Sequence, residues 1–381
     1  MDRPNGKGGR PGIPPQPQRI GKAMSDPMIY PYVLDPKLAP AIWGGDELVK
    51  AFGKRGDPNA KIGESWECWD ADKVTDGALA GESVADLRAR LGSQLLGNLD
   101  PAQIFPVLTK IITAHDWLSV QVHPDDAYAQ RVEHQPNGKT ECWYVFAAEP
   151  GAQLVLGWTR DTSRDEYERR VADGTLGEIL RKIPVKAGDT VYIPAGTVHA
   201  IGAGVVLFET QQASDLTYRM FDWNRVGADG KPRQLHIEKA ADVLDYRAGN
   251  TGALMQIPYR FEGLDRIALI DDGHFVVERV TAGREPASLA TNGRPLILMT
   301  LDASMEVSCA GVKIALPRYQ TTLIPAAAES CTVRAAAENS AGSPSAAFMF
   351  VTPPLDRALL ASRLAAAGVE RARIDRFLMQ F

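Results

Sequence analysis

GDTVYIPAGTVH, residues 188–199, is the stretch of the chain that decides its fold. Gly188 begins a turn into an expected strand at 190–193, Pro194 ends that strand, and Gly196 permits a tight reversal of the backbone. His199 then opens the next strand with its side chain turned back toward the first one. The stretch predicts a barrel of short antiparallel strands that holds an imidazole in its interior.

A second stretch, WLSVQVHPDD at 117–126, adds polar side chains to that interior. Strand alternation places Ser119, Gln121 and His123 on one face and apolar side chains on the other. A polar face turned into a barrel costs free energy unless its groups are paired or bind something. We therefore expect this strand to contribute to a binding site.

A third stretch, GKTECWYVF at 138–146, contributes charge. Glu141 shares a face with Trp143 and Val145, so a carboxylate stands in an otherwise apolar, inward row. Lys139 has the same parity and is expected at the same cavity.

Most of the remaining chain predicts short strands separated by Gly, Pro, Asn and Asp, which favours a sandwich or barrel and a mainly β fold. The clearest predicted strands are 117–123, 141–147, 190–193, 205–211, 274–280 and 296–301. Two helices are expected, at 83–96, where Ser83 and Asp86 resemble a capping box, and at 164–182. The tail is expected to form one or two helices broken at Gly368.

These patterns divide the chain into four expected segments. They are a disordered extension (1–28), a catalytic β domain with helical insertions (29–255), a second β domain (256–353) and a helical tail (354–381). The first 27 residues are rich in Pro, Gly and basic side chains and hold no apolar segment typical of a secretory signal. Met24 and Met28 are both available as later starts.

Composition excludes several classes of protein. The net charge of −5 argues against a nucleic-acid-binding protein, which would carry clustered basic charge. No run approaches about 18 consecutive apolar residues, so no membrane span is expected. The four cysteines are far apart in sequence, which is typical of free thiols in a reducing cytoplasm. We expect a cytoplasmic protein with a small-molecule partner, either a monomer or a dimer.

The spacing in 188–199 matches the second motif of the cupins, although Ala203 replaces the usual asparagine and Gln121-Val122-His123 replaces the usual His-x-His. Six motifs, taken together, resemble the type I phosphomannose isomerases, which are zinc cupins. They are AIWGG (41–45), GESWE (63–67), SVQVHPDD (119–126), NGKTECWYV (137–145), IPAGTVHAIG (193–202) and ETQQASDLTYRMFDWNR (209–225). Because residues 124–198 leave room for only one helix, the short bacterial type is expected.

The resemblance implies a jelly-roll catalytic domain, followed by a second, degenerate cupin-like domain. It also implies a metal held by Gln121, His123, Glu141 and His199. Two imidazoles, a carboxylate and an amide form an N/O site that suits catalytic zinc, one ion per chain. Without thiolates, Mn²⁺, Co²⁺ and Fe²⁺ suit the same ligands.

The family's substrate-binding residues also have counterparts here. The resemblance implies catalytic roles for Arg219, Glu209 and Lys139, and substrate contacts for Trp43, Ser119 and Arg225. The implied reaction interconverts mannose 6-phosphate and fructose 6-phosphate through a cis-enediol. Glu209 is the expected base because its parity with Leu207 turns it inward; a metal-bound water or Lys139 could also serve.

Two alternatives remain open at this stage: another sugar-phosphate isomerase of the cupin superfamily, and a non-catalytic sugar-phosphate sensor. The second β domain is expected to hold no metal. Its segment LPRYQTTLIPAAAESCTV, 316–333, resembles the turn of 188–199 but has no histidine, and His274 is the only histidine of the block. His115, His134, His236 and His274 are expected to have structural or surface roles.

Overall fold

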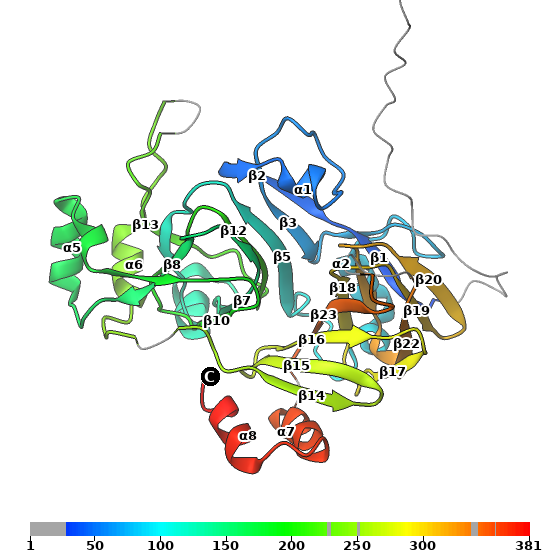
Figure 1. Ribbon diagram of the computed structural model, residues 1–381. Helices are drawn as coiled ribbons and strands as arrows, with labels where there is room; N and C mark the ends of the chain where they lie inside the picture. Colours follow the sequence, from blue (N-terminus) through cyan, green and yellow to red (C-terminus); the bar gives the residue numbers. More distant parts are fainter. Residues whose placement is uncertain (1–27, 227–229, 250–251, 337–341, 355) are drawn as a thin grey trace, which may run out of the picture.

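The computed structural model describes residues 28–226, 230–249, 252–336, 342–354 and 356–381. The extension predicted at 1–28 therefore lies outside the described residues, apart from Met28. Most of the described chain forms antiparallel strands with helices at the margins (Figure 1), which confirms the mainly β prediction. In the described part of the chain, no helix is long and apolar enough to cross a membrane.

The first half of the chain forms two antiparallel sheets with an apolar core between them. One sheet has the order β10-β7-β12-β5-β3-β2, made of Thr190–Ile193, Glu141–Ala148, Val205–Gln212, Val107–Ala114, Ile62–Cys68 and Lys37–Gly45. The other has the order β13-β6-β11-β8-β9, made of Tyr218–Phe221, Val120–Val122, His199–Ile201, Gln153–Trp158 and Leu180–Pro184. Strands of both sheets contribute buried side chains to one cluster, among them Ile112, Trp143, Leu154, Leu156 and Leu207.

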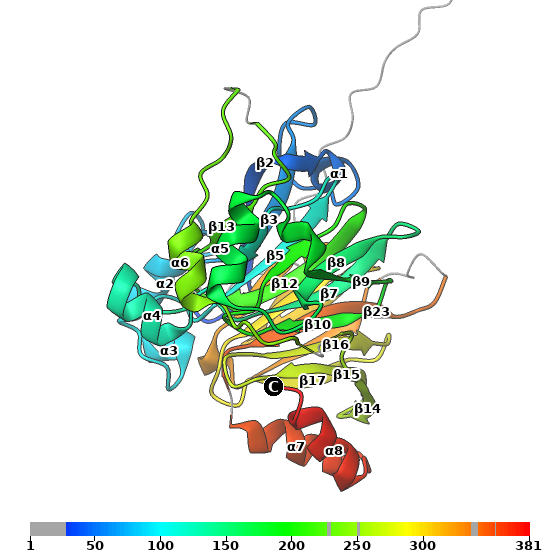
Figure 2. The same ribbon diagram turned by 90° about the vertical axis from the view of Figure 1, so that its left-hand side faces the viewer.

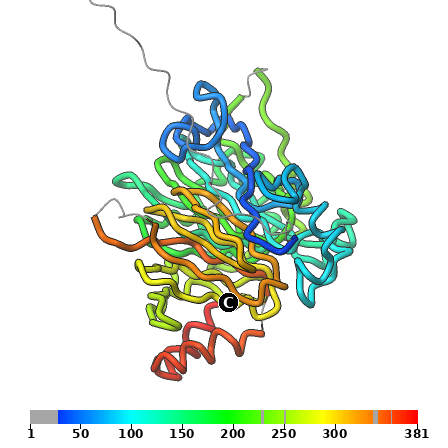
Figure 3. The backbone as a smooth tube through the Cα atoms, turned by 90° about the vertical axis from the view of Figure 1, so that its right-hand side faces the viewer, coloured from blue at the N-terminus to red at the C-terminus, as the bar shows by residue number. Residues whose placement is uncertain are grey.

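The second half forms another pair of sheets. An eight-stranded sheet has the order β14-β15-β16-β23-β18-β21-β1-β4, made of Ile257–Phe261, Leu264–Asp271, Val276–Ala282, Ala346–Thr352, Leu296–Thr300, Thr321–Ile324, Tyr32–Asp35 and Lys73–Val74. A four-stranded sheet has the order β17-β22-β19-β20, made of Ala287–Ala290, Ser330–Ala335, Met305–Cys309 and Val312–Leu316. The N-terminal strand β1 thus pairs with β21, and Figure 3 shows the first strands beside the late ones.

Helices lie at the edges of this β framework. They are α1 (Glu47–Lys50), α2 (Val84–Leu91), α3 (Ser93–Leu96), α4 (Asp126–Tyr128), α5 (Arg164–Ala172), α6 (Ile237–Val243), α7 (Arg357–Ala366) and α8 (Arg371–Leu378), with a π-helix at Ala129–Glu133 and 3₁₀ turns at Leu176–Glu178 and Ala326–Ala328. The helices α7 and α8 pack below β14 (Figures 1 and 2), where Leu360, Leu364 and Phe377 join Ile257 in a buried cluster. Gly368 separates them with a φ of +82°, as the sequence predicts.

The first predicted helix forms, but it is divided at Gly92. Ser83 accepts a hydrogen bond from the amide of Asp86, and the Asp86 carboxylate accepts one from the amide of Ser83, so the predicted capping box is present. Gly92 then adopts a φ of +52°, which ends α2 before α3 begins.

The second predicted helix, 164–182, is wrong in its C-terminal half. α5 ends at Ala172, Gly174 turns the chain with a φ of +69°, and Leu180–Pro184 is strand β9 paired with β8. Tyr167, Leu176 and Leu180 are buried in one apolar cluster. Their spacing fits a single helix. In the structure, however, Tyr167 is buried from α5, Leu176 from a 3₁₀ turn and Leu180 from strand β9.

The predicted strands are largely confirmed. β10 has the predicted ends, while β7 and β12 each extend one residue beyond 147 and 211. The strand expected at 117–123 is shorter, Val120–Val122, and the one expected at 274–280 is shifted to Val276–Ala282. The shift has a local cause, since the Asp272 carboxylate accepts the amides of His274 and Phe275 in a turn before the strand.

A buried ion pair links the two halves of the chain. Lys54 lies 2.6 Å from the Glu67 carboxylate on β3 and donates to the carbonyl of Tyr319. Glu67 also accepts hydrogen bonds from Ser65 and from Thr321 on β21, at 2.6 and 2.8 Å. Because Glu67 has no exposed surface, these donors replace all of its hydration.

We predict that Lys54→Met lowers the free energy of unfolding by about 3–5 kcal/mol, because it leaves the buried Glu67 carboxylate without its counter-charge. Urea denaturation followed by tryptophan fluorescence measures the change. The matched control is Lys50→Met, which removes an exposed ammonium paired with Asp46 and should leave the denaturation midpoint unchanged. Equal effects of the two substitutions would contradict this role for Lys54.

Candidate metal centre and active site

Strands of both sheets and one turn bring the predicted metal ligands together. His199 at the start of β11 pairs with Gln121 on β6, and Glu141 at the start of β7 pairs with Ile193 at the end of β10. Gly196 lies in the turn between β10 and β11 with a φ of +86°, and its amide donates to the carbonyl of His123 at 2.9 Å. The turn predicted from the sequence therefore attaches one histidine segment directly to the other.

The four predicted ligands converge inside the barrel. Glu141 lies between the two imidazoles, with its oxygens 3.5 Å from His123 Nε2 and 3.2 Å from His199 Nε2. The ligand atoms of these three residues all lie within 4.8 Å of one another. The amide of Gln121 reaches His199 Nε2 at 3.2 Å. The three ionisable groups are buried, so this is an enclosed cluster of one carboxylate and two imidazoles.

Backbone carbonyls orient both imidazoles. His123 Nδ1 lies 2.8 Å from the carbonyl oxygen of Leu216, and His199 Nδ1 lies 2.8 Å from that of Thr197. A carbonyl only accepts, so each Nδ1 carries the proton and each Nε2 offers a lone pair to the cluster. This tautomer is the one that a metal-binding histidine uses.

The electrostatics of the cluster favour neutral imidazoles beside an ionised carboxylate. Burial, together with the charge of Lys139, lowers the pKa of His123 to about 3, and burial also lowers the pKa of His199. Burial alone would raise the pKa of Glu141, but the charge of Lys139 outweighs it and holds that pKa well below its usual range. Lys139 Nζ lies 3.0 Å from the Glu141 carboxylate.

The residues fit a divalent metal ion. His123 Nε2 and both carboxylate oxygens of Glu141 are buried and have no hydrogen-bond partner in the described part of the chain, although Lys139 forms an ion pair with one of the oxygens. Buried acceptors of this kind cost free energy unless a cation or donor satisfies them. Nitrogen and oxygen donors without thiolates suit Zn²⁺, Mn²⁺, Co²⁺ or Fe²⁺, so the donor set does not select one of them.

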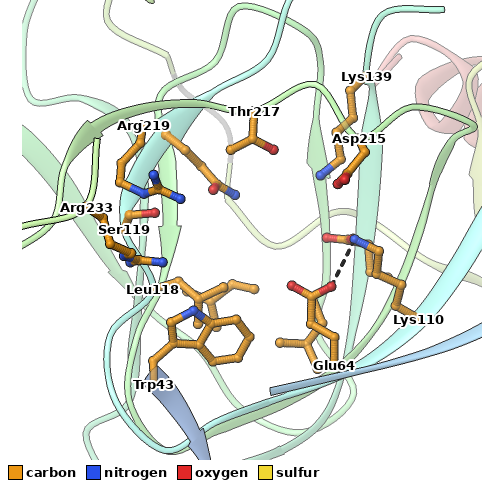
Figure 4. Close-up of a pocket in the computed structure, with 14 residues that line it drawn as sticks. Trp43, Glu64, Lys110, Leu118, Ser119, Lys139, Asp215, Thr217, Arg219 and Arg233 are labelled. Carbon is orange, nitrogen blue, oxygen red and sulfur yellow. Dashed lines mark ion pairs between the residues drawn. The ribbon is translucent and has the colours of Figure 1, made fainter. Parts of the chain in front are cut away.

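A cavity of about 340 Å³ adjoins the cluster at Gln121 and Lys139. Figure 4 shows two opposed walls: the arginine wall, with Arg219, Arg233 and Ser119, and the acidic wall, with Glu64 and Asp215 beside Lys110 and Lys139. Trp43, Ser119, Lys139, Glu209 and Arg219 line the cavity, as the sequence predicts.

Trp43 reaches the cavity because Gly63 leaves room for it. A Cβ atom at Gly63 would lie 2.3 Å from Cζ3 of the Trp43 ring. The motifs at 41–45 and 63–67 therefore form one feature, in which a side chain of β2 packs against the bare backbone of β3.

A chain of charges on the acidic wall was not predicted from the sequence. Lys110 on β5 lies 3.3 Å from both Glu64 on β3 and Glu209 on β12. Burial would raise the pKa of Glu64, but Lys110 outweighs it and the pKa is lowered; for Glu209, burial and Glu141 prevail and the pKa is raised. The indole of Trp143 donates to Glu209 at 2.9 Å. The only local sign of Lys110 is a single charge in the apolar run PVLTKIITA, 106–114.

Arg225, the predicted substrate contact, lies outside the lining of this cavity. Its guanidinium instead binds Asp222 at 2.6 Å and the carbonyl of Trp117. Arg233, which the sequence reasoning missed, lines the cavity in its place. It lies in KPRQLH, 231–236, where nothing in the local pattern distinguishes it from a surface charge.

Comparisons with known proteins agree with this geometry. A family model described as "Phosphomannose isomerase type I, catalytic domain" matches residues 32–144. A mannose-6-phosphate isomerase of Streptococcus mutans is 42% identical over 257 residues, which cover 66% of this chain and 78% of that protein. The chain belongs to the type I mannose-6-phosphate isomerase family.

Solved structures of this isomerase family show the same fold. The crystal structure of mannose 6-phosphate isomerase from Bacillus subtilis superposes with a TM-score of 0.75 at 28% identity, covering 84% of this chain and 99% of that one. A putative mannosephosphate isomerase from Archaeoglobus fulgidus, 22% identical, superposes with a TM-score of 0.66 over 87% of this chain and 100% of that one. The predicted cupin fold is confirmed.

We predict that His199→Ala lowers the bound divalent metal from about one ion per chain to near zero, because one of the two imidazole ligands is lost. Elemental analysis of the purified protein measures this. His274→Ala is the matched control, since His274 lies against Asp272 in the second half of the chain. A second ion per chain that disappears in His274→Ala would show that the metal assignment is wrong.

Proposed function

We propose that this protein interconverts D-mannose 6-phosphate and D-fructose 6-phosphate, with one zinc ion per chain held by Gln121, His123, Glu141 and His199. The observation that carries the proposal is the buried His123–Glu141–His199 cluster, which meets a cavity whose far wall bears two arginines. A bound divalent ion supplies a Lewis acid that polarises the sugar carbonyl and its neighbouring hydroxyl. The remaining chemistry is assigned to side chains of this protein.

The arginine wall binds the phosphate, and the acidic wall faces the reacting carbons. Arg219 offers a guanidinium fork to phosphate oxygens. Trp43 and Ser119 line the space between the walls and orient the sugar. Lys139, beside the metal cluster, stabilises the negative charge that develops on the enediol oxygens.

Glu209 acts as the base that moves the proton between C1 and C2. Its carboxylate is buried at the cavity, and the raised pKa makes it a stronger proton acceptor than an ordinary glutamate. The indole of Trp143 and the ammonium of Lys110 hold it in place from two sides. This hydrogen bond and this ion pair keep the Glu209 carboxylate in position while the proton is returned to the neighbouring carbon.

The second β domain, 256–353, has a structural role in this proposal. Its turn at Pro325 continues into the 3₁₀ helix Ala326–Ala328, with no histidine at the place of His199. Its sheet includes β1 from the N-terminal segment, so the boundary at 255 separates the halves in sequence rather than in the sheet. The apolar cluster that spans Tyr32, Phe105, Phe208, Ile297 and Val351 joins the two halves.

The proposal is tested by a coupled assay for fructose 6-phosphate formed from mannose 6-phosphate. We expect turnover by the metal-loaded protein, its loss after chelation, and its recovery when zinc is added back. Undiminished turnover by metal-free protein would exclude the metal assignment. A chain that binds mannose 6-phosphate without turning it over would be a sensor rather than an isomerase.

We predict that Glu209→Gln lowers kcat by about 10²–10⁴-fold with little change in KM or metal content, because the amide cannot accept the proton. Glu149→Gln, a change at an exposed carboxylate outside this cavity, is the control and should leave kcat unchanged. Wild-type kcat in Glu209→Gln would transfer the role of base to another group, with Lys139 the next to test.

A further inference from the structure

Two guanidinium groups, those of Arg219 and Arg233, line the arginine wall, and a third, that of Arg225, contacts Asp222 outside the cavity lining. Arg225 is engaged with the protein at all three nitrogens: its Nε and Nη2 donate to Asp222, and its Nη1 donates to the carbonyl of Trp117 and to Asp116. Four of its five N–H groups are used in this way, so this guanidinium supports Asp222.

Arg233 is held by the same carboxylate but presents a free side to the cavity. Its Nε and Nη2 donate to the two oxygens of Asp222, at 2.7 and 2.5 Å, in a bidentate pair. Within the described part of the chain, its Nη1 has no hydrogen-bond acceptor. The side chain remains 25% exposed and lines the cavity beside Arg219 (Figure 4).

The position of Arg233 is fixed by the base of the loop that carries it. A β-bridge joins Val226 to Pro232, and the amide of His236 donates to the carbonyl of Arg219 at 2.8 Å. The Arg219 amide donates in turn to His236 Nδ1 at 3.1 Å. Arg219 and Arg233 thus belong to two neighbouring segments that are joined by hydrogen bonds between Arg219 and His236.

This wall has more positive charge than the protein neutralises. Arg219 Nη1 donates to the carbonyl of Gln234, while its Nε is buried and has no hydrogen-bond partner in the described residues. Arg225 and Arg233 share the Asp222 carboxylate, and Asp116 lies 3.4 Å from Arg225, so three guanidinium groups face two carboxylates among the described residues. A dianionic phosphate would satisfy both the unpaired donors and the surplus charge.

We propose that Arg233 is the second phosphate ligand, acting together with Arg219, and that Asp222 is a positioning residue that holds its guanidinium at the cavity. This inference rests on the proposed function, and it adds a specificity determinant to it. Sugars without a phosphate forfeit both guanidinium contacts, so the pair selects 6-phosphorylated substrates.

The test uses the metal-loaded, full-length protein and its variants Arg233→Ala, Arg233→Lys and Asp222→Asn. For Arg233→Ala we expect KM for mannose 6-phosphate to rise by about 10- to 100-fold, with kcat within about threefold of wild type. The inhibition constant of inorganic phosphate should rise by the same factor. Arg233→Lys keeps the charge without the fork and should lie between wild type and Arg233→Ala.

Asp222→Asn should raise KM by a smaller factor, and adding it to Arg233→Ala should raise KM no further, because Asp222 acts through Arg233. Independent, multiplying effects would show that Asp222 has another role. Arg247→Ala, which removes an exposed guanidinium paired with Asp245, is the control and should change neither constant.

An active wild-type enzyme whose KM and phosphate inhibition are unaffected in both Arg233 variants would overturn the inference while leaving the proposed function intact. If the wild type has no isomerase activity, the proposed function fails, and calorimetric titration with inorganic phosphate decides the inference by itself. Weaker phosphate binding in Arg233→Ala supports the inference, and equal binding refutes it. Should Arg233→Ala fail to fold, the same comparison is made with Arg233→Lys.

Discussion

A carboxylate with no exposed surface, that of Glu141, sets the main physical constraint on this structure. An isolated charge in such a place would cost several kcal/mol, so the surrounding chain must supply positive charge and metal-binding partners. Lys139 and the two imidazoles do so, and each imidazole is turned toward Glu141 by a backbone carbonyl. The short strands β6 and β11, the first residue of β7 and the Gly196 turn are arranged around that requirement.

The charges that line the cavity also determine how a sugar phosphate is oriented in it. On the acidic wall the charges of Lys110 and Lys139 are paired with carboxylates. On the opposite wall Arg219 and Arg233 keep unpaired donors, which attract a phosphate. A sugar phosphate held at the arginines extends its other end toward Lys139 and the metal ligands. Binding of a part of the substrate that does not react therefore orients the part that does. In our proposal this separation of charge accounts for both specificity and catalysis.

The residues predicted from the sequence are those whose positions depend on local geometry. Strand alternation predicts that His123 and Glu141 point inward, and the turn at Gly196 predicts the same for His199. The structure brings all three side chains together. Lys110 and Arg233 were missed because sheet order and a loop, rather than local patterns, bring them to the cavity. The helix expected at 164–182 failed for a related reason, since tertiary packing decided between a helix and strand β9.

The most direct test is a crystal structure of the metal-loaded protein with bound mannose 6-phosphate, in which anomalous scattering locates the ion. The account predicts one ion bound by Gln121, Nε2 of His123, Nε2 of His199 and the Glu141 carboxylate, with the phosphate at the opposite wall against Arg219 and Arg233. An ion bound elsewhere, or a phosphate bound beside the metal ligands, would contradict it.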